Sequence, residues 1–165
     1  MIHHVTPLLP SPALSGRSGA DVWLKMEALQ PSGSFKLRGM GNACRRAVER
    51  GARRLLTSSG GNAGLAVAYA ARQLGVPVTV VVPRRTDQRM RELIAEQGAT
   101  VEVHGEVWDD AHAHALRWAG DPDVALIHPF DHPDVWEGHA TLVDEVLARG
   151  VAPDAVVVAV GGGGL

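Results

Sequence analysis

One lysine, Lys36, lies in the short stretch PSGSFKLRG (31–39), among small residues and directly after Phe35. The pattern predicts that Lys36 is in the first turn of a helix, where positive charge is disfavoured. Because this position destabilises the ammonium form, we expect a lowered pKa, as an imine-forming lysine requires. The small residues before it would let a ligand approach the backbone closely. A solvated surface lysine is the ordinary alternative, and this stretch alone does not exclude it.

A second stretch, SSGGNAG (58–64), follows a predicted strand and opens a predicted helix. The residues from Ser58 to Gly61 offer hydroxyl and backbone N–H groups, and the helix N-terminus adds partial positive charge. Such a loop suits a carboxylate or a phosphate. Two interpretations of Asn62 stand side by side: its side chain caps the helix, or its amide faces a ligand.

The third stretch is the glycine run 161–164, which follows a predicted buried strand over 155–160. No GK[ST] follows the run, so it is not a P-loop, and a dinucleotide site would need an acidic residue about 20 positions later. In α/β folds a glycine-rich turn after a parallel strand normally opens into a helix. We therefore expect the 165 residues to be the N-terminal part of a longer protein.

The composition excludes several classes of function. The net charge of −2 gives no electrostatic case for nucleic acid, and the 45% hydrophobic content is typical of a globular protein. The N-terminus does not read as a signal peptide, and no apolar run approaches 18 residues, so a membrane span is not expected. A cytoplasmic location is the resulting expectation. Cys44 is the single cysteine, so there is no disulfide framework, and we expect it to be a small, half-buried apolar residue of a helix.

The histidines do not predict a metal site. His112 and His114 are two positions apart and cannot share a helix face, and His128 and His132 flank a loop with no third ligand nearby. We expect turn residues for the second pair. His139 is expected to be a packed, hydrogen-bonded histidine near the active-site wall.

The two tryptophans Trp108 and Trp118 are ten residues apart on one predicted helix, where core or packing positions are expected.

From about residue 53, strand-like and helix-like segments alternate, which predicts βαβ units and a four-stranded parallel sheet. The predicted strands are 53–59, 78–83, 100–105 and 124–130, and the predicted helices are 62–75, 87–98 and 106–120. Outside this unit we expect a strand in 20–29 and an amphipathic helix over 136–150.

Together, PSGSFKLRG, SSGGNAG and GGGGL resemble the fold-type II (tryptophan synthase β-like) family of pyridoxal-phosphate enzymes. Within it, KMEALQPSGSFKLRG, AVAYAARQLGVPVTVVVP and PFDHPDVWEGHAT are most similar to the L-serine dehydratase/L-threonine deaminase branch. The resemblance covers essentially the whole chain, while full-length members are roughly twice as long. It implies a small four-stranded parallel α/β domain (31–135) inserted in an incomplete larger domain that binds pyridoxal phosphate (1–30 and 136–165).

The resemblance also implies roles for single residues. Lys36 would form the imine with pyridoxal 5'-phosphate and then move protons, and Phe35 would line the cofactor pocket. Gly161, Gly162, Gly163 and Gly164 would bind the phosphate through backbone N–H groups. Ser59, Gly60, Gly61 and Asn62 would bind the substrate carboxylate, with Asn62 also near the cofactor's phenolic oxygen.

Gly60 lies where close serine dehydratases often carry alanine, which implies a roomier pocket and weaker serine activity. The partner of the pyridine nitrogen and the ligands of a monovalent cation would lie in the second half, and no metal site is expected here.

The implied reaction is β-elimination of L-serine or L-threonine to pyruvate or 2-oxobutanoate plus ammonia, impaired in a shortened chain. A homodimer is the implied assembly of the full-length form. Two alternatives stay open. One is another fold-type II enzyme, such as a threonine synthase or a serine racemase-like protein. The other is a non-catalytic phosphate-binding fragment.

Overall fold

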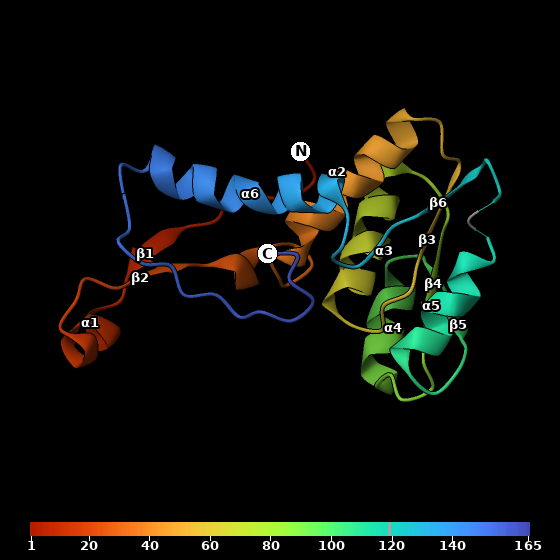
Figure 1. Ribbon diagram of the computed structural model, residues 1–165, viewed down its shortest axis with the longest axis horizontal. Coiled ribbons are helices and arrows are strands. Elements are labelled where there is room, and N and C mark those ends of the chain that lie inside the picture. Colours follow the sequence, from red (N-terminus) through yellow and green to blue (C-terminus); the bar gives the residue numbers. More distant parts are fainter. Residues whose placement is uncertain (119) are drawn as a thin grey trace.

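The structure is a computed structural model that describes residues 1–118 and 120–165. A layered α/β part lies at one end, and an arm formed by both ends of the chain extends from it (Figure 1). The arm contains β1 (Leu8–Pro10), α1 (Pro12–Ser18), β2 (Trp23–Lys25), a 3₁₀ turn (Glu27–Leu29) and α6 (Pro133–Ala148). The α/β part contains α2 (Lys36–Glu49), β3 (Arg54–Thr57), α3 (Asn62–Leu74), β4 (Val78–Val82), α4 (Gln88–Glu96), β5 (Thr100–Val103), α5 (Trp108–Leu116) and β6 (Val124–Leu126).

The four predicted strands of the α/β part form one parallel sheet with the order β5-β4-β3-β6, as the strand–helix alternation predicts. Successive residues of a strand point to opposite faces. Leu55 accordingly packs in the larger core with α2, α3 and α4, whereas Leu56 and Val81 pack against α5 on the other face. The sheet is therefore covered on both faces, and its carboxyl edge carries the loops that follow β3 and β6.

Two sequence-based expectations about the helices and strands are only partly met. The segment 20–29 holds the short strand β2, which pairs antiparallel with β1 before the 3₁₀ turn. The helix expected over 106–120 is shorter, and Trp118 lies beyond its end with 44% of its surface exposed, so it is not a core residue. Ala119, inside the expected range, lies outside the described residues.

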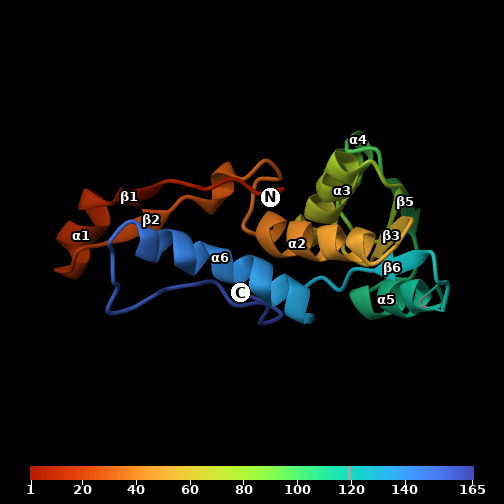
Figure 2. The ribbon, with the colours of Figure 1, turned by 90° about the horizontal axis from the view of Figure 1, so that it is seen from above.

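The prediction of a buried strand over 155–160 is wrong for this structure. These residues form no strand, and Val156 and Val157 are 66% and 97% exposed. A strand needs a neighbour to satisfy its backbone groups, and no described strand pairs with this segment. The segment instead runs back below α6, bringing the C-terminus near α2 (Figures 1 and 2).

Two glycines let α2 and α6 pack closely side by side (Figure 2). A Cβ on Gly138 would lie 2.4 Å from the carbonyl oxygen of Arg38, and a Cβ on Gly39 would lie 2.7 Å from that of Val135. Real Cβ atoms do not approach backbone this closely, so larger residues would push the helices apart. The contact fixes the residues at the start of α2 against α6.

A buried ion network joins α2 to the arm. The guanidinium of Arg38, fully buried, donates to both carboxylate oxygens of Glu27 at 2.7 and 2.8 Å and to both of Glu145 at 2.7 and 2.8 Å. Lys25 also binds Glu145. Two cations thus face two carboxylates, which avoids an uncompensated buried charge.

Among the described residues, no helix is long and apolar enough to cross a membrane.

Replacing Arg38 by Met should lower the free energy of unfolding by about 3–5 kcal/mol, because the carboxylates of Glu27 and Glu145 would stay buried without their main partner. Urea unfolding followed by circular dichroism measures this loss. The matched control is Arg45→Met on the same helix, where the exposed Arg45–Glu49 pair should contribute less than about 1 kcal/mol. Equal losses for the two variants would contradict the network's role.

The same network predicts a loss of stability in acid. Burial alone would raise the pKa of Glu145, but hydrogen bonds from Arg38 and Lys25 lower it to about 2. A lowered pKa stabilises the fold above the ordinary value of 4.5, and this stabilisation is lost as the pH falls from there toward 2.

Thermal unfolding between pH 7 and pH 2 measures the effect. Glu145→Gln should be less stable at neutral pH and lose less stability over the acid range than the unchanged chain. The exposed Glu49→Gln variant is the control. An acid loss in Glu145→Gln as large as in the unchanged chain would refute this assignment.

Candidate active site

Lys36 is the first residue of α2, as predicted, and its amine is half-buried at the base of the arm. Burial lowers its pKa, so the structure attributes the shift to desolvation, whereas the sequence suggested the helix terminus. Its Nζ donates to the carbonyl oxygen of Pro129 at 3.0 Å and lies 5.2 Å from the centre of the Phe35 ring. In the described chain no carboxylate forms a salt bridge with it, so no ion pair opposes this lowering of the pKa.

The glycine run lies beside this lysine. A cavity of about 240 Å³ is lined by Phe35, Lys36 and the segment 159–165, which includes all four glycines. Phe130 packs closely against the glycine run. A Cβ on Gly162 would lie 2.6 Å from the Phe130 ring, and a Cβ on Gly164 would lie 2.6 Å from the Phe130 carbonyl oxygen. The structure therefore brings together the lysine, the aromatic residue and the glycines that the sequence singled out.

These residues fit pyridoxal phosphate. In the described part of the chain, the N–H groups of residues 161–164 donate no hydrogen bond to backbone or side chain, so they are free for an anion. Gly163 has φ of 80°, which glycine adopts readily and other residues rarely do. A phosphate at these N–H groups and an aldehyde at Lys36 would share one cavity.

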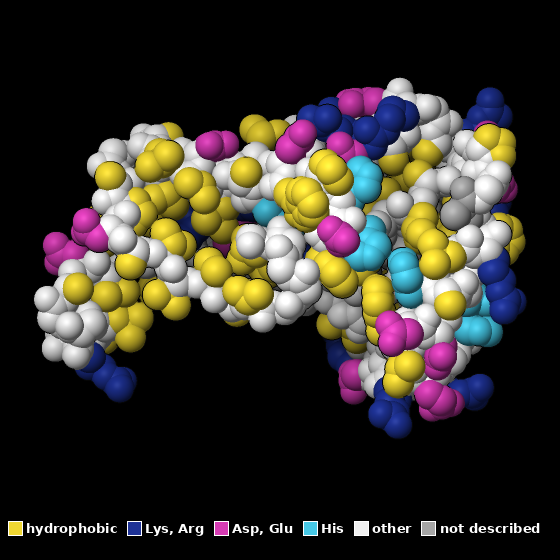
Figure 3. Space-filling view, in the orientation of Figure 1, with side chains coloured by type: hydrophobic (Ala, Val, Ile, Leu, Met, Phe, Trp, Pro, Cys, Tyr) yellow, Lys and Arg dark blue, Asp and Glu magenta, His cyan; other side chains and the backbone are white. Residues whose placement is uncertain are grey.

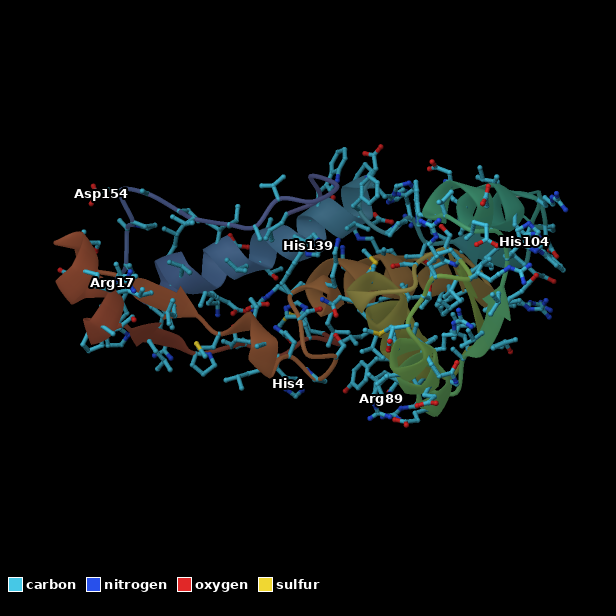
Figure 4. The ribbon with its side chains drawn as sticks, turned by 90° about the horizontal axis from the view of Figure 1, so that it is seen from below. His4, Arg17, Arg89, His104, His139 and Asp154 are labelled. Atoms are coloured by element: carbon cyan, nitrogen blue, oxygen red, sulfur yellow. The ribbon has the colours of Figure 1, made fainter. Side chains whose placement is uncertain are left out.

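His139 is a residue of α6 (Figure 4), and its ring packs against Gly39 of α2. Its ring centre is 5.0 Å from that of Phe35, and a Cβ on Gly39 would touch its ring. Burial and the nearby Lys36 lower its pKa to about 4, so it is neutral at neutral pH. It is packed, as predicted, but neither ring nitrogen has a hydrogen-bond partner in the described chain, so the expected hydrogen bond is absent.

The residues of the loop after β3 differ in whether they are available to a ligand. Ser58 is fully buried, and its hydroxyl is hydrogen-bonded to Nδ1 of His112 at 2.8 Å, so it is not available to a ligand. Asn62 is the first residue of α3, whose N-cap is Gly61 and has no side-chain cap. Asn62 is exposed and does not cap the helix, which leaves its amide free to face a ligand.

The loop from Ser59 to Asn62 does not line the 240 Å³ cavity of Lys36. Beside it, Thr86 occupies the space on one side of Gly60, where a Cβ would lie 2.1 Å from the threonine Oγ1. On that side, the glycine therefore leaves no empty volume, and the expectation of a roomier pocket has no support there.

A group of aromatic rings connects the two loops. Trp108 stacks on His112 with 4.7 Å between ring centres, and its ring lies 5.9 Å from that of Phe130. His128 meets the edges of both His112 and Phe130, at 5.3 and 4.7 Å. Histidine side chains also gather on this face of the surface (Figure 3).

Sequence reasoning placed His128 in a turn and Trp108 at a core or packing position, and for His112 it only argued against a metal pair. It missed the common location of these residues. The available signal was that each lies at or beyond the carboxyl end of a strand of the predicted parallel sheet, and these ends meet at one edge.

A second cavity, of about 220 Å³, lies between α2 and the edge strand β6 and is lined in part by Arg50, His132 and Asp134. It contains none of the predicted site residues. Within residues 1–118 and 120–165, no three His, Cys, Asp or Glu side chains are grouped to hold a metal ion.

The chain is similar to known proteins over nearly its full length. The family described as "Pyridoxal-phosphate dependent enzyme" matches residues 1–165. A human serine dehydratase-like protein is 50% identical over 164 residues, which cover 99% of this chain and 50% of that protein. Human L-serine dehydratase/L-threonine deaminase is 48% identical over 166 residues, with 99% and 51% covered. The chain thus spans about half the length of the curated relatives it matches.

Solved structures give the same fold. A threonine deaminase from T.th. superposes with a TM-score of 0.86 at 40% identity, covering 98% of this chain and 53% of that one. A fungal L-serine ammonia-lyase from Rhizomucor miehei gives 0.83 at 41% identity, covering 90% and 47%. The predicted fold class, fold-type II α/β with a parallel sheet, is confirmed. With its full length matched, the chain belongs to the family of pyridoxal-phosphate dependent enzymes.

Proposed function

We propose that this chain provides the cofactor-attaching half of an L-serine/L-threonine ammonia-lyase that uses pyridoxal phosphate. The observation that supports this proposal most directly is that one cavity is lined by Lys36, Phe35 and residues 161–164, whose N–H groups are unpaired in the described chain. The relatives named for serine and threonine deamination, at 48–51% identity, support this substrate class. The reaction is β-elimination, which gives pyruvate or 2-oxobutanoate plus ammonia.

Lys36 carries the chemistry in this proposal. Its lowered pKa increases the fraction of neutral amine, which is the form that attacks an aldehyde. Once the substrate's amino group has replaced it, the same amine removes the proton from Cα. When bound, pyridoxal phosphate supplies an electron sink that makes this proton acidic. The substrate then loses its β-hydroxyl as water, and the released 2-aminoacrylate or its methyl homologue hydrolyses to the 2-oxo acid and ammonia.

In this proposal the other site residues bind the cofactor and the substrate and orient them. Gly161 to Gly164 would hold the phosphate through their N–H groups, and Phe35, which lines the same cavity, would bind the cofactor ring. Ser59, Gly60, Gly61 and Asn62, which lie outside the 240 Å³ cavity, would hold the substrate carboxylate and so fix the position of Cα relative to the lysine. The Asn62 amide also faces the cofactor's phenolic oxygen in this assignment.

The racemase alternative has weaker support from the comparisons. Serine racemase structures from Dictyostelium discoideum and maize are 31% and 27% identical to this chain, and a threonine deaminase from Solanum lycopersicum is also 31% identical. The T.th. threonine deaminase and the Rhizomucor miehei L-serine ammonia-lyase are 40% and 41% identical, and it is these two that favour the deaminase assignment. We also propose that the enzyme acts in amino acid catabolism in the cytoplasm and that a homodimer is its full-length assembly. The pyridine-nitrogen partner is assigned to the half of the relatives that this chain does not cover, so the 165 residues alone should show little or no dehydratase activity.

The chain allows a sharp test of attachment, because it contains two lysines, Lys25 and Lys36. Lys25 is bound to Glu145 and donates to the carbonyl oxygen of Thr6 at 2.6 Å, so its amine is engaged. Incubation with pyridoxal phosphate, borohydride reduction and peptide mapping should therefore place the label on Lys36. Reduction fixes an imine permanently, so the label reports the covalent contact directly.

Lys36→Arg should abolish the label and Lys25→Arg should keep it. A label on Lys25, or equal labelling of both lysines, would contradict the assignment. Binding of pyridoxal phosphate without any reducible adduct would instead favour a non-catalytic phosphate-binding fragment.

A further inference from the structure

Ser58 is held from two sides by the first turns of α5. Its hydroxyl is hydrogen-bonded to Nδ1 of His112 at 2.8 Å, and its carbonyl oxygen accepts from the indole Nε1 of Trp108 at 2.5 Å. The two α5 side chains are four positions apart on the helix and stack on each other. Ser58 is the residue directly before the loop assigned to the substrate carboxylate.

The two contacts leave Ser58 little freedom. Its side chain has no exposed surface, so a lost partner would leave a buried hydroxyl unsatisfied. The loop that follows has no such anchor, because the N–H groups of Ser59, Gly60 and Gly61 donate no hydrogen bond in the described chain. The direction in which these N–H groups point is therefore set mainly by Ser58 at one end and by α3 at the other.

The α5 residues that hold Ser58 are also connected to the glycine run proposed to bind the cofactor phosphate. Trp108 lies against Phe130, and Phe130 supports Gly162 of the phosphate-binding run. The same α5 residues thus lie between the loop assigned to the carboxylate and the loop assigned to the phosphate. A fixed distance between these two anion sites is what an amino acid joined to the cofactor would require.

We propose that His112 is a positioning residue that, with Trp108 and through Ser58, orients the Ser59–Asn62 loop for the substrate carboxylate. This inference rests on the proposed function and deepens it, since it names what sets the carboxylate site. His112 itself touches neither the substrate nor the cofactor in this assignment.

The variants separate the hydrogen bond from simple packing. His112→Phe keeps a ring on Trp108 but removes Nδ1, whereas His112→Asn keeps a hydrogen-bonding atom near the Nδ1 position. Ser58→Ala removes the same bond from the other side and decides the question if His112→Phe does not fold. His114→Phe is the matched control, because His114 lies on the same helix and binds Glu102 instead.

The first readout is the backbone order of residues 59–62, measured by nitrogen-15 relaxation on the chain alone. His112→Phe and Ser58→Ala should lower the order parameters from the rigid value of about 0.85 toward about 0.6 in this loop, with residues 161–164 unchanged. His112→Asn should retain the order, and so should His114→Phe. Unchanged order in both His112→Phe and Ser58→Ala would overturn the proposal, as would a uniform loss throughout the sheet.

The second readout is the affinity of the chain loaded with pyridoxal phosphate for L-serine, followed by absorbance. His112→Phe should weaken L-serine binding about tenfold and leave the affinity for pyridoxal phosphate unchanged. Equal weakening of both affinities, or of neither, would overturn the proposal. If the unchanged chain binds the cofactor but not L-serine, the substrate assignment fails for this chain, and the loop order alone decides the role of His112.

Discussion

The arrangement of the site depends on one short segment, Pro129 and Phe130, at the carboxyl end of β6. The carbonyl oxygen of Pro129 accepts from Lys36 Nζ, and the ring of Phe130 lies directly behind Gly162. A glycine is required there because any Cβ would strike the ring. One segment therefore places a half-buried amine and a set of unpaired N–H groups around the same cavity, although they are far apart in the sequence.

The contacts between α2, α6 and the 3₁₀ turn explain why the amine of Lys36 stays beside Pro129 and Phe130. Gly39 and Gly138 allow α2 and α6 to touch. The buried Arg38 of α2 binds Glu145 of α6 and Glu27 of the 3₁₀ turn. Lys36 lies two residues before Arg38, at the start of the same helix. Burying this network costs desolvation energy, but its two carboxylates neutralise its two cations. It therefore holds α2, α6 and the 3₁₀ turn in one arrangement. The lowered pKa of Lys36 follows from this burial and not from a neighbouring charge.

The sequence predicted the parallel sheet well, because strand–helix alternation with glycine and capping signals is local information. The motifs around Lys36 and the glycine run were also predictable from residue types. The strand expected over 155–160 failed because β-pairing depends on a neighbour, which no local pattern supplies. The roles of Ser58 and His112 were missed for a similar reason, since their contact joins residues 54 positions apart. The burial of Arg38 likewise depends on partners from three separate segments.

The central claim is that the glycine run binds the phosphate of a cofactor attached to Lys36. Its most direct test compares the amide spectrum of the chain with pyridoxal phosphate and with pyridoxal, which lacks the phosphate. Pyridoxal phosphate should shift the amide signals of residues 161–164 together with those of Phe35 and Lys36. Pyridoxal should shift the signals near the lysine and leave the glycines in place. Glycine signals that stay unmoved while pyridoxal phosphate modifies Lys36 would contradict the account.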